Sequence, residues 1–348
     1  MIDRRVLLFL LCLFLYGFTG VLHADSILGV ASAYNLVALG YGSTPGKISV
    51  SSDVGGRIAA AGEVVNAPEV GQSLVYDSFG TLAAGYLEVA DGGVGGHTNV
   101  QANGSIYAPG ASSSQFSFNY GGTLVTTGAS PINFATLSST LDGESLYLGS
   151  LLSTGQVLVH GQAGFPSGAN PSWTVLYGTS STLNIFDITA AQLASVNNPL
   201  DIDVPAGATV IINVAGSADT LGGAIYINGV QPSETSNLGA DVIFNFDDAS
   251  SVALDGQFTA SMLAPFAEVT GNSSIDGTII AAEIVDGGEV HNDEFAGSLP
   301  TPQTALTPEP GGLILLGTGM FGIACLTLLR RNWGIGLVAI PVERVWEK

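Results

Sequence analysis

The chain has few basic residues and almost no cysteine. Eight of its 348 residues are Lys or Arg, and 29 are Asp or Glu. Between positions 25 and 307 the only basic residues are Lys47 and Arg57, against 25 acidic ones, so this segment has a net charge of −23. Such a charge repels nucleic acid and anionic lipid headgroups, which argues against a DNA- or RNA-binding protein. The two cysteines, Cys12 and Cys325, lie near the chain ends, so the central segment must be stable without disulfides.

The N-terminus has the features of a secretory signal. Arg4 and Arg5 precede an apolar run at residues 6–16, which is too short to span a membrane comfortably. Ala24 is a small residue suited to a cleavage site. We therefore predict that residues 1–24 form a signal peptide and that the protein is exported.

The C-terminal region carries a longer apolar run. Residues 311–329 contain no charge, and nineteen helical residues at ~1.5 Å each nearly cross a ~30 Å hydrocarbon core. Arg330 and Arg331 follow and would keep that flank on the cytoplasmic side. The sequence thus predicts a proline-rich linker at 301–310, a transmembrane helix at 311–331 and a short tail at 332–348.

The order of these C-terminal features resembles a known sorting signal. Pro308-Glu309-Pro310, the apolar run and the pair Arg330-Arg331 together resemble the PEP-CTERM signal of Gram-negative bacteria. The resemblance implies processing by an exosortase, a membrane peptidase that releases or re-anchors its substrates. The expected location is therefore the membrane, the cell surface or the extracellular space of a Gram-negative bacterium.

A five-residue pattern recurs in the central segment. Residues 56–60, 80–84 and 104–108 share Gly-x-[Ile/Leu]-x-Ala at intervals of 24 residues, and residues 262–264 and 277–281 echo it 17 residues apart. Coils of this length are typical of a β-solenoid, in which equivalent strands stack about 4.8 Å apart. We therefore predict a mainly β fold, a β-solenoid over residues 25–300. A β-sandwich whose strands repeat by chance is the alternative.

In a solenoid the copies of this pattern should occupy adjacent parallel strands. Alternate residues of a strand face one side, so the Ile or Leu and the Ala of each copy would point inward together. The glycine before each copy permits the corner at which the chain turns to a new face. Ile58, Leu82 and Ile106 should then stack in one inward ladder.

Two segments have helical patterns. Ser130 and Pro131 form an N-cap and N1 pair, and apolar residues follow on one helical face until Gly155: Phe134, Leu137, Leu141, Leu148 and Leu151. Because Gly143 and Gly149 would weaken this helix in isolation, it should be stabilised by packing along the solenoid. Residues 189–192 have capping-box spacing and predict a second, short helix. Strands are expected around residues 173–177, 183–186, 208–214, 224–227 and 241–246.

The central segment also resembles a known domain family. Residues 34–40 and 52–60 look like the opening of the choice-of-anchor A domain. The later parts of that domain are matched by residues 186–189, 204–208, 263–265, 288–291 and 295–300. The resemblance covers about residues 28–300 and implies a surface-attached β-helical domain with a role in adhesion. It brings no catalytic motif.

Metal-binding motifs are sparse. The three histidines of the central segment are far apart in sequence and no cysteine accompanies them, so no zinc site is expected: His97, His160 and His291. The densest acidic cluster could bind Ca²⁺ weakly, although a solvated cap on the last coil is the favoured interpretation: Asp286, Glu289, Asp293 and Glu294. No other cofactor is expected.

No nucleophile–base pair and no nucleotide-binding motif is recognisable. Glycoside hydrolysis needs only two carboxylates at a suitable separation, so the 25 acidic residues leave that activity open. We expect a surface-anchored binding or structural protein, an adhesin or matrix component, and not an enzyme. Its partners would be the processing peptidase, the membrane, and an extracellular polysaccharide or surface protein. The alternatives are a glycan-cleaving enzyme and an ice-binding solenoid, the latter disfavoured because no regular Thr-x-Thr ladder appears.

Overall fold

The computed structural model describes residues 27–75, 86–101, 104–119, 121–193, 199–233 and 236–302. The chain divides into two units, residues 1–300 and 301–348, and every described helix and strand belongs to the first. The predicted signal peptide, residues 1–24, lies outside the described residues, as do Pro308, Glu309, Pro310, Arg330 and Arg331 of the predicted sorting signal. None of the helices in the described ranges is both long and apolar enough to cross a membrane.

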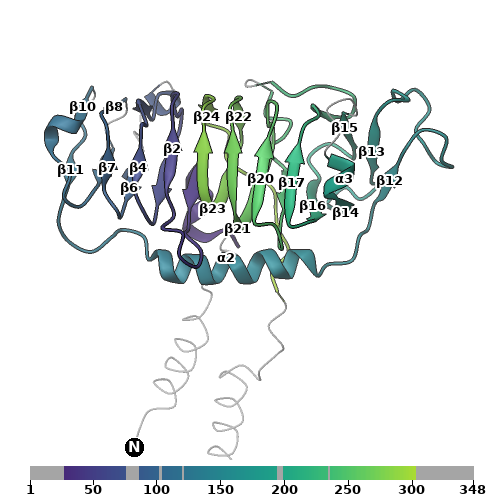
Figure 1. Ribbon diagram of the computed structural model, residues 1–348. Helices are drawn as coiled ribbons and strands as arrows, with labels where there is room; N and C mark the ends of the chain where they lie inside the picture. Colours follow the sequence, from purple (N-terminus) through teal and green to yellow (C-terminus); the bar gives the residue numbers. More distant parts are fainter. Residues whose placement is uncertain are drawn as a thin grey trace, which may run out of the picture. The chain divides into compact units, whose positions relative to one another are not determined.

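The fold is mainly β, and its strands form three faces through which successive coils of the chain pass in the same order (Figure 1). The first coil runs from β1 (Leu36–Ala38) to β2 (Ile48–Val50), and then through Val54 before β3 (Ile58–Ala60) returns to the first face. All strand pairs except β12 with β13 are parallel among the described strands. This is a β-helix-like arrangement, as the repeats predicted.

The first face, which we call the helix face, is the longest and is covered by α2 (Phe134–Gly149). Its ten strands follow the order β11 (Leu124–Val125), β9 (Ser105–Tyr107), β6 (Tyr86–Ala90), β3, β1, β23 (Ile279–Asp286), β21 (Ser261–Gly271), β19 (Val242–Asn245), β16 (Thr209–Ala215) and β14 (Leu183–Thr189).

The second face, which we call the front face, turns toward the viewer in Figure 1. It consists of β7 (Val94–Gly95), β4 (Val64–Val65), β2, the C-terminal parts of β23 and β21, β20 (Ser251–Leu254) and β17 (Ala218–Leu221). The long strands β21 and β23 thus contribute to both the helix face and the front face.

The third face is made of shorter sheets. One holds β10 (Phe116–Phe118), β8 (Thr98–Val100) and β5 (Glu69–Val70), and another holds β22 (Ile275–Asp276) and β24 (Val290–His291). Val54 bridges them by pairing with both Val70 and Val290. In the coils at the other end the same position is taken by β12 (Gln156–Leu158), β13 (Thr174–Tyr177), β15 (Leu200–Asp203) and β18 (Ile225–Ile227).

The order of the coils along the stack differs from their order in the sequence. Coils move outward from β1 to β11, α2 then runs back along the helix face, and coils from β14 onward return until β23 pairs with β1 (Figure 1). Leu36 therefore lies beside Ile279, with Val37 beside Ile280. The first and the last coil in the sequence are therefore neighbours, and both lie in the middle of the stack.

The interior has two hydrophobic clusters, separated by the helix face. One fills the space between the three faces and includes Ile58, Ile106 and Phe244. The other lies between the helix face and α2 and includes Val37, Ile280 and Leu141. Each strand of the helix face therefore buries side chains on both sides, which explains its nearly continuous apolar sequence.

The predicted inward ladder of Ile58, Leu82 and Ile106 is wrong at its middle residue, Leu82. Ile58 and Ile106 are both fully buried and face the interior, as expected, but the residue aligned between them is Glu88 of β6. Leu82 lies outside the described residues and is not in β6. The pattern at 80–84 does not mark the strand. The true strand lies six residues later, where it has an acidic residue at the ladder position and a bulge between Tyr86 and Glu88.

The copies near the C-terminus have the predicted register. Met262 pairs with Ile279 and Ala264 pairs with Ala281, so the 17-residue spacing corresponds to one turn of the solenoid. The five expected strands between residues 173 and 246 are also present, as β13, β14, β16, β18 and β19.

The main helix is shorter than predicted but buries the predicted face. Its N-cap is Asn133, whose side chain accepts a hydrogen bond from the Thr136 N–H at 3.1 Å, so the helix begins after the predicted Ser130 cap. It ends at Gly149, not Gly155, and Phe134, Leu137, Leu141 and Leu148 are buried together with Ser145. The short helix α3 (Ala190–Leu193) is also present, and Gln192 Oε1 accepts from the Thr189 N–H at 2.8 Å.

Polar side chains fix α2 on the sheet. Asn245 Nδ2 donates to the Ser145 carbonyl and to Asn213 Oδ1, each at 3.0 Å, while Ser145 Oγ donates to Asn245 Oδ1 at 2.7 Å. Asn213 Nδ2 donates in turn to the Leu148 carbonyl at 3.0 Å. These buried groups satisfy one another, and their geometry defines a single position of the helix along the strands.

Candidate functional site

The front face presents one continuous row of uncharged side chains. The strand register aligns Gly95, Val65, Ser49, Val285, Thr270, Ala253 and Thr220 across seven parallel strands. None of them is buried, whereas the neighbouring positions Ile48, Ile284 and Val269 point inward and are fully or almost fully buried. Because parallel strands lie about 4.8 Å apart, the row is a regular, weakly polar stripe of short side chains.

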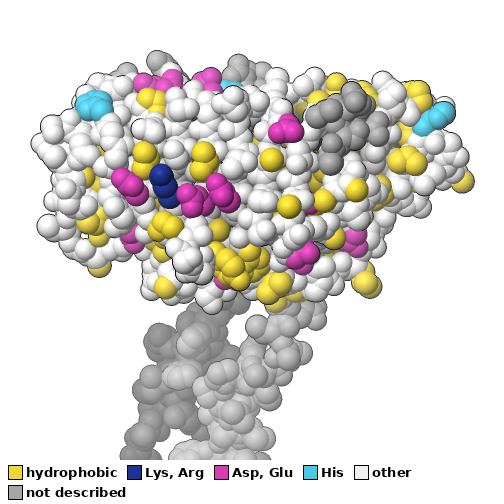
Figure 2. Space-filling view, viewed as in Figure 1, with side chains coloured by type: hydrophobic (Ala, Val, Ile, Leu, Met, Phe, Trp, Pro, Cys, Tyr) yellow, Lys and Arg dark blue, Asp and Glu magenta, His cyan; other side chains and the backbone are white. Residues whose placement is uncertain are grey.

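A charged row lies beside this stripe. Glu283 pairs with Glu268 and Glu268 with Ser251, while Lys47 and Glu63 stand one position before Ile48 and Val64 in the same alignment. Figure 2 shows the result from the front: a basic group lies between acidic groups on a surface that is otherwise mostly uncharged. Three carboxylates against one ammonium make this edge of the front face negative.

Two carboxyl groups lie beneath the front face. Asp219 is 4% exposed, and neither of its carboxylate oxygens has a hydrogen-bond partner among the described residues. Burial, aided by the charge of Asp248, raises the pKa of Asp219 to about 6. Burial also raises the pKa of Asp286 to about 6, although the Gly288 and Gly287 N–H groups oppose the shift. Both groups face inward and do not contribute to the outer surface.

The structure does not bring the four candidate calcium ligands together in one group. Within the described ranges, no group of three or more His, Cys, Asp or Glu side chains is placed to hold a metal ion. Asp286 is buried at the end of β23, where its Oδ2 accepts from the Gly288 N–H at 3.2 Å, whereas the Glu289 side chain is half exposed on the third face. Asp293 and Glu294 follow β24 in the segment that leaves the last coil. The four residues are close in sequence, but they belong to three different parts of the last coil: the end of β23, the turn before β24 and the segment after β24.

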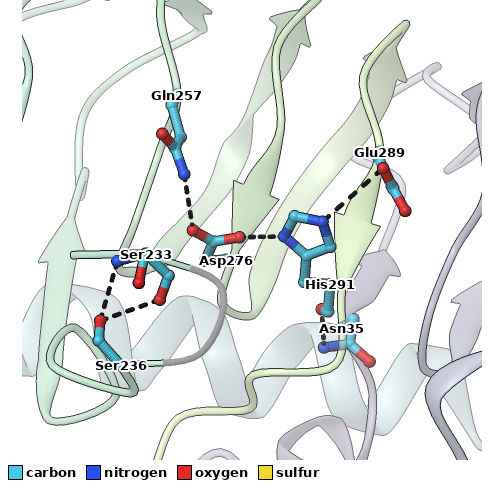
Figure 3. A network of polar contacts seen from close by, with 7 residues as sticks. All are labelled: Asn35, Ser233, Ser236, Gln257, Asp276, Glu289 and His291. Carbon is cyan, nitrogen blue, oxygen red and sulfur yellow. Dashed lines mark hydrogen bonds and ion pairs between the residues drawn. The ribbon is translucent and has the colours of Figure 1, made fainter.

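A different polar network lies on the third face (Figure 3). His291 Nδ1 contacts Asp276 Oδ1, Gln257 Nε2 donates to Asp276 Oδ2 at 2.9 Å, and Glu289 Oε2 lies 3.8 Å from His291 Nε2. Asn35 Nδ2 donates to the His291 backbone carbonyl at 3.0 Å. The network joins three neighbouring coils, and Asp276 at its centre is only 6% exposed.

A recess of about 460 Å³ opens beside this network. It is lined by Gln231, Pro232, Ser233, Gln257, Ser274 and His291. His97 and His160 are elsewhere: His97 contacts the Ser114 carbonyl and Ser117 Oγ, and His160 packs edge-on against Phe165. The three histidines are therefore not brought together.

The geometry can be compared with known proteins. A family model described as "Putative Ice-binding-like adhesive domain" matches residues 27–292, which include all three faces, the front stripe and the recess. The chain belongs to this family of ice-binding-like adhesive domains. The match confirms the adhesive character that we expected of the central segment, whereas the resemblance to choice-of-anchor A domains stays a prediction.

Other comparisons are more distant. No curated protein sequence matches the chain. A solved structure that matches is the crystal structure of an ice-binding protein from an Antarctic bacterium of the Flavobacteriaceae, with 14% identity and a TM-score of 0.35. The match covers 80% of this chain and 50% of that chain, so this adhesive domain aligns with about half of the length of that protein.

Sequence reasoning missed both surfaces of the adhesive domain that could bind a ligand. The front stripe takes one residue from each of seven strands, and most of these are too short to show more than a brief alternation such as Ile48-Ser49-Val50. The network on the third face takes Gln257 and Asp276 from coils that precede His291 by a turn or more. The 17-residue spacing between coils would have suggested that Asp276 lies near His291, since these residues are 15 apart.

Proposed function

We propose that the chain is an exported, surface-displayed adhesive protein that binds an extracellular polymer through its front face without cleaving it. The observation that carries the proposal is the uncharged stripe across seven parallel strands, within a domain of an adhesive family. Repeated short side chains at a fixed spacing suit an extended polymer, because each contact is weak and many can form at once.

The charge of the domain selects among polymers. The net charge of −23 between positions 25 and 307 and the acidic row beside the stripe repel anionic polysaccharides. Neutral glycans and basic proteins remain as ligands. Many copies on one cell would strengthen binding that is weak for a single domain.

Both ends of the described domain lie at the helix face. Leu28 and Phe295 belong to the cluster between α2 and the helix face, and Leu299 packs against that cluster. Neither end of the described domain is therefore part of the front stripe.

The test is retention of the purified full chain on immobilised neutral and acidic polysaccharides and on matrix proteins. Thr270→Arg places a long charged side chain in the middle of the stripe and should reduce retention several-fold. Thr140→Arg is the matched control, because Thr140 is exposed on α2, away from the front face. Equal retention of both variants would refute binding through the stripe. Release of new reducing ends during the incubation would instead support a glycan-cleaving enzyme.

Ice binding is a second candidate, favoured by the same stripe. β-Branched side chains occupy four of the seven positions of the stripe: Val65, Val285, Thr270 and Thr220. The measurement is thermal hysteresis and ice shaping by the full chain, with Thr270→Arg as the disruptive variant. Absence of both effects in the unmodified chain would exclude this function.

A further inference from the structure

We infer that the recess on the third face is a second ligand site, which binds a single neutral sugar residue. Its lining side chains supply two carboxamides, two hydroxyls and an imidazole: Gln231, Gln257, Ser233, Ser274 and His291. Each of these groups can exchange hydrogen bonds with hydroxyl groups, and the amides and hydroxyls can both donate and accept. The site is separate from the front stripe and extends the proposed binding function to a second surface.

Two polar groups of the recess, Gln257 and His291, are held in place before a ligand arrives. Asp276, only 6% exposed, accepts from Gln257 Nε2 at 2.9 Å through one oxygen and contacts His291 Nδ1 through the other. Asn35 holds the backbone of His291 through the 3.0 Å hydrogen bond to its carbonyl. A ligand that meets groups already fixed loses less conformational entropy of side chains on binding.

The same contacts determine what each group offers to a ligand. Because Gln257 gives one Nε2 hydrogen to Asp276, its amide plane is fixed, with the other Nε2 hydrogen and Oε1 left for a ligand. The Asp276 carboxylate at Nδ1 fixes the orientation of the His291 ring, so that its Nε2 edge has one position at the recess. The wall of the recess therefore holds both a donor and an acceptor of Gln257 in a fixed position, and the hydroxyl groups of a sugar can use both.

The volume of the recess and the charges around it restrict the kind of ligand that can bind. A volume of about 460 Å³ falls within the range of small-molecule sites, and the recess is open, so a sugar unit can enter while the rest of its chain stays outside. Asp276 lies behind the wall and Glu289 lies 3.8 Å from His291 Nε2. Two carboxylates so close to the site disfavour anionic sugars such as glucuronate.

The test is titration of the purified full chain with the methyl glycosides of glucose, galactose and mannose, monitored by saturation-transfer NMR and calorimetry. We expect saturable binding of at least one of them in the millimolar range, and binding of glucuronate several-fold weaker. Gln257→Leu should weaken binding about tenfold, because it removes a donor and an acceptor from the wall. No saturable binding of any neutral glycoside, or glucuronate binding as tightly as glucose, would overturn the inference.

Matched variants separate a ligand contact from a structural effect. Gln101→Leu is the control for Gln257→Leu: Gln101 follows β8 on the same face and donates from Nε2 to Glu69 Oε2 at 2.6 Å, but it does not line the recess. Gln101→Leu should leave the dissociation constant of the glycoside within about twofold of that of the unmodified chain. Gln231→Leu, at an exposed lining position, should weaken binding even if Gln257→Leu fails to fold. Equal losses from Gln101→Leu and Gln257→Leu would overturn the inference.

The outcome is independent of the front stripe. Thr270→Arg should leave glycoside binding unchanged, because Thr270 belongs to the row on the front face. A chain that adheres to polymers but binds no glycoside would refute the recess as a site and leave the adhesive function intact. A chain that binds a glycoside but does not adhere to polymers would support the recess as a site and refute the adhesive function.

Discussion

The interior ladder of the helix face contains a carboxyl group where the neighbouring coils place isoleucine. Glu88 aligns with Ile58 on one side and with Ile106 on the other, and its side chain is fully buried. Neither carboxylate oxygen has a hydrogen-bond partner among the described residues. Burial raises the pKa of Glu88 from 4.5 to about 8. Its titration should therefore add to those of Asp219 and Asp286 in making the stability of the domain depend on pH.

Replacing Glu88 by Gln keeps the shape of the side chain and removes the titration. The native state binds a proton that the unfolded state releases above pH 4.5, so the stability of the unmodified chain falls as pH rises through the window from 4.5 to about 8. At 1.36 kcal/mol per pH unit, holding the proton at pH 7 costs about 3 kcal/mol. Glu88→Gln should therefore be the more stable chain by about 3 kcal/mol at pH 7, with little difference at pH 4.

The assay is urea denaturation of both full chains at a series of pH values from 4 to 8, with the free energy of unfolding compared at each. Glu63→Gln is the control, because the same substitution at this exposed position of the front face should change stability by less than about 0.5 kcal/mol throughout. A difference between Glu88→Gln and the unmodified chain that is the same at pH 4 and pH 8 would refute the burial argument.

Two glycines of α2 should respond oppositely to alanine. At Gly143 an added Cβ meets nothing within 4 Å, so Gly143→Ala should stabilise the domain by about 0.5–1 kcal/mol. At Gly149 it would overlap the Asp247 carboxylate, so Gly149→Ala should lower the melting temperature, and stabilisation by both variants would contradict the close approach. Mass spectrometry of the mature protein should show that residues up to about Ala24 have been removed, and an intact N-terminus in the cytosol would contradict export.

Much of the local structure could be predicted from the sequence. The apolar spacing of Phe134, Leu137, Leu141 and Leu148 defines the buried face of α2, because side chains three or four residues apart share one side of a helix. The 17-residue interval likewise gave the correct pairing of β21 with β23. These features depend only on residues within one element or one coil, so a single stretch of sequence contains the information.

The order of the coils was decided by the tertiary structure. β1 pairs with β23 because α2 carries the chain back along the helix face, and the second half then winds toward the first. Nothing in residues 36–38 or 279–281 indicates that they are neighbours. Their pairing satisfies the backbone groups of two strands that would otherwise be edges in the middle of the stack.

In the two candidate sites, too, some features follow from the local sequence and others only from the tertiary structure. Alternation within each short strand, such as Ile48-Ser49-Val50, determines which side chain points outward, and this is a local property of the chain. Which outward side chains become neighbours depends on the register between coils, and the bulge at β6 shows that one extra residue changes it. The sequence by itself therefore determined the solenoid-like character and the acidic surface. Only the tertiary structure, by stacking the coils in register, aligned Ser49 with Val285 and Thr270, brought Gln257 and His291 together at Asp276, and buried Glu88 between two isoleucines.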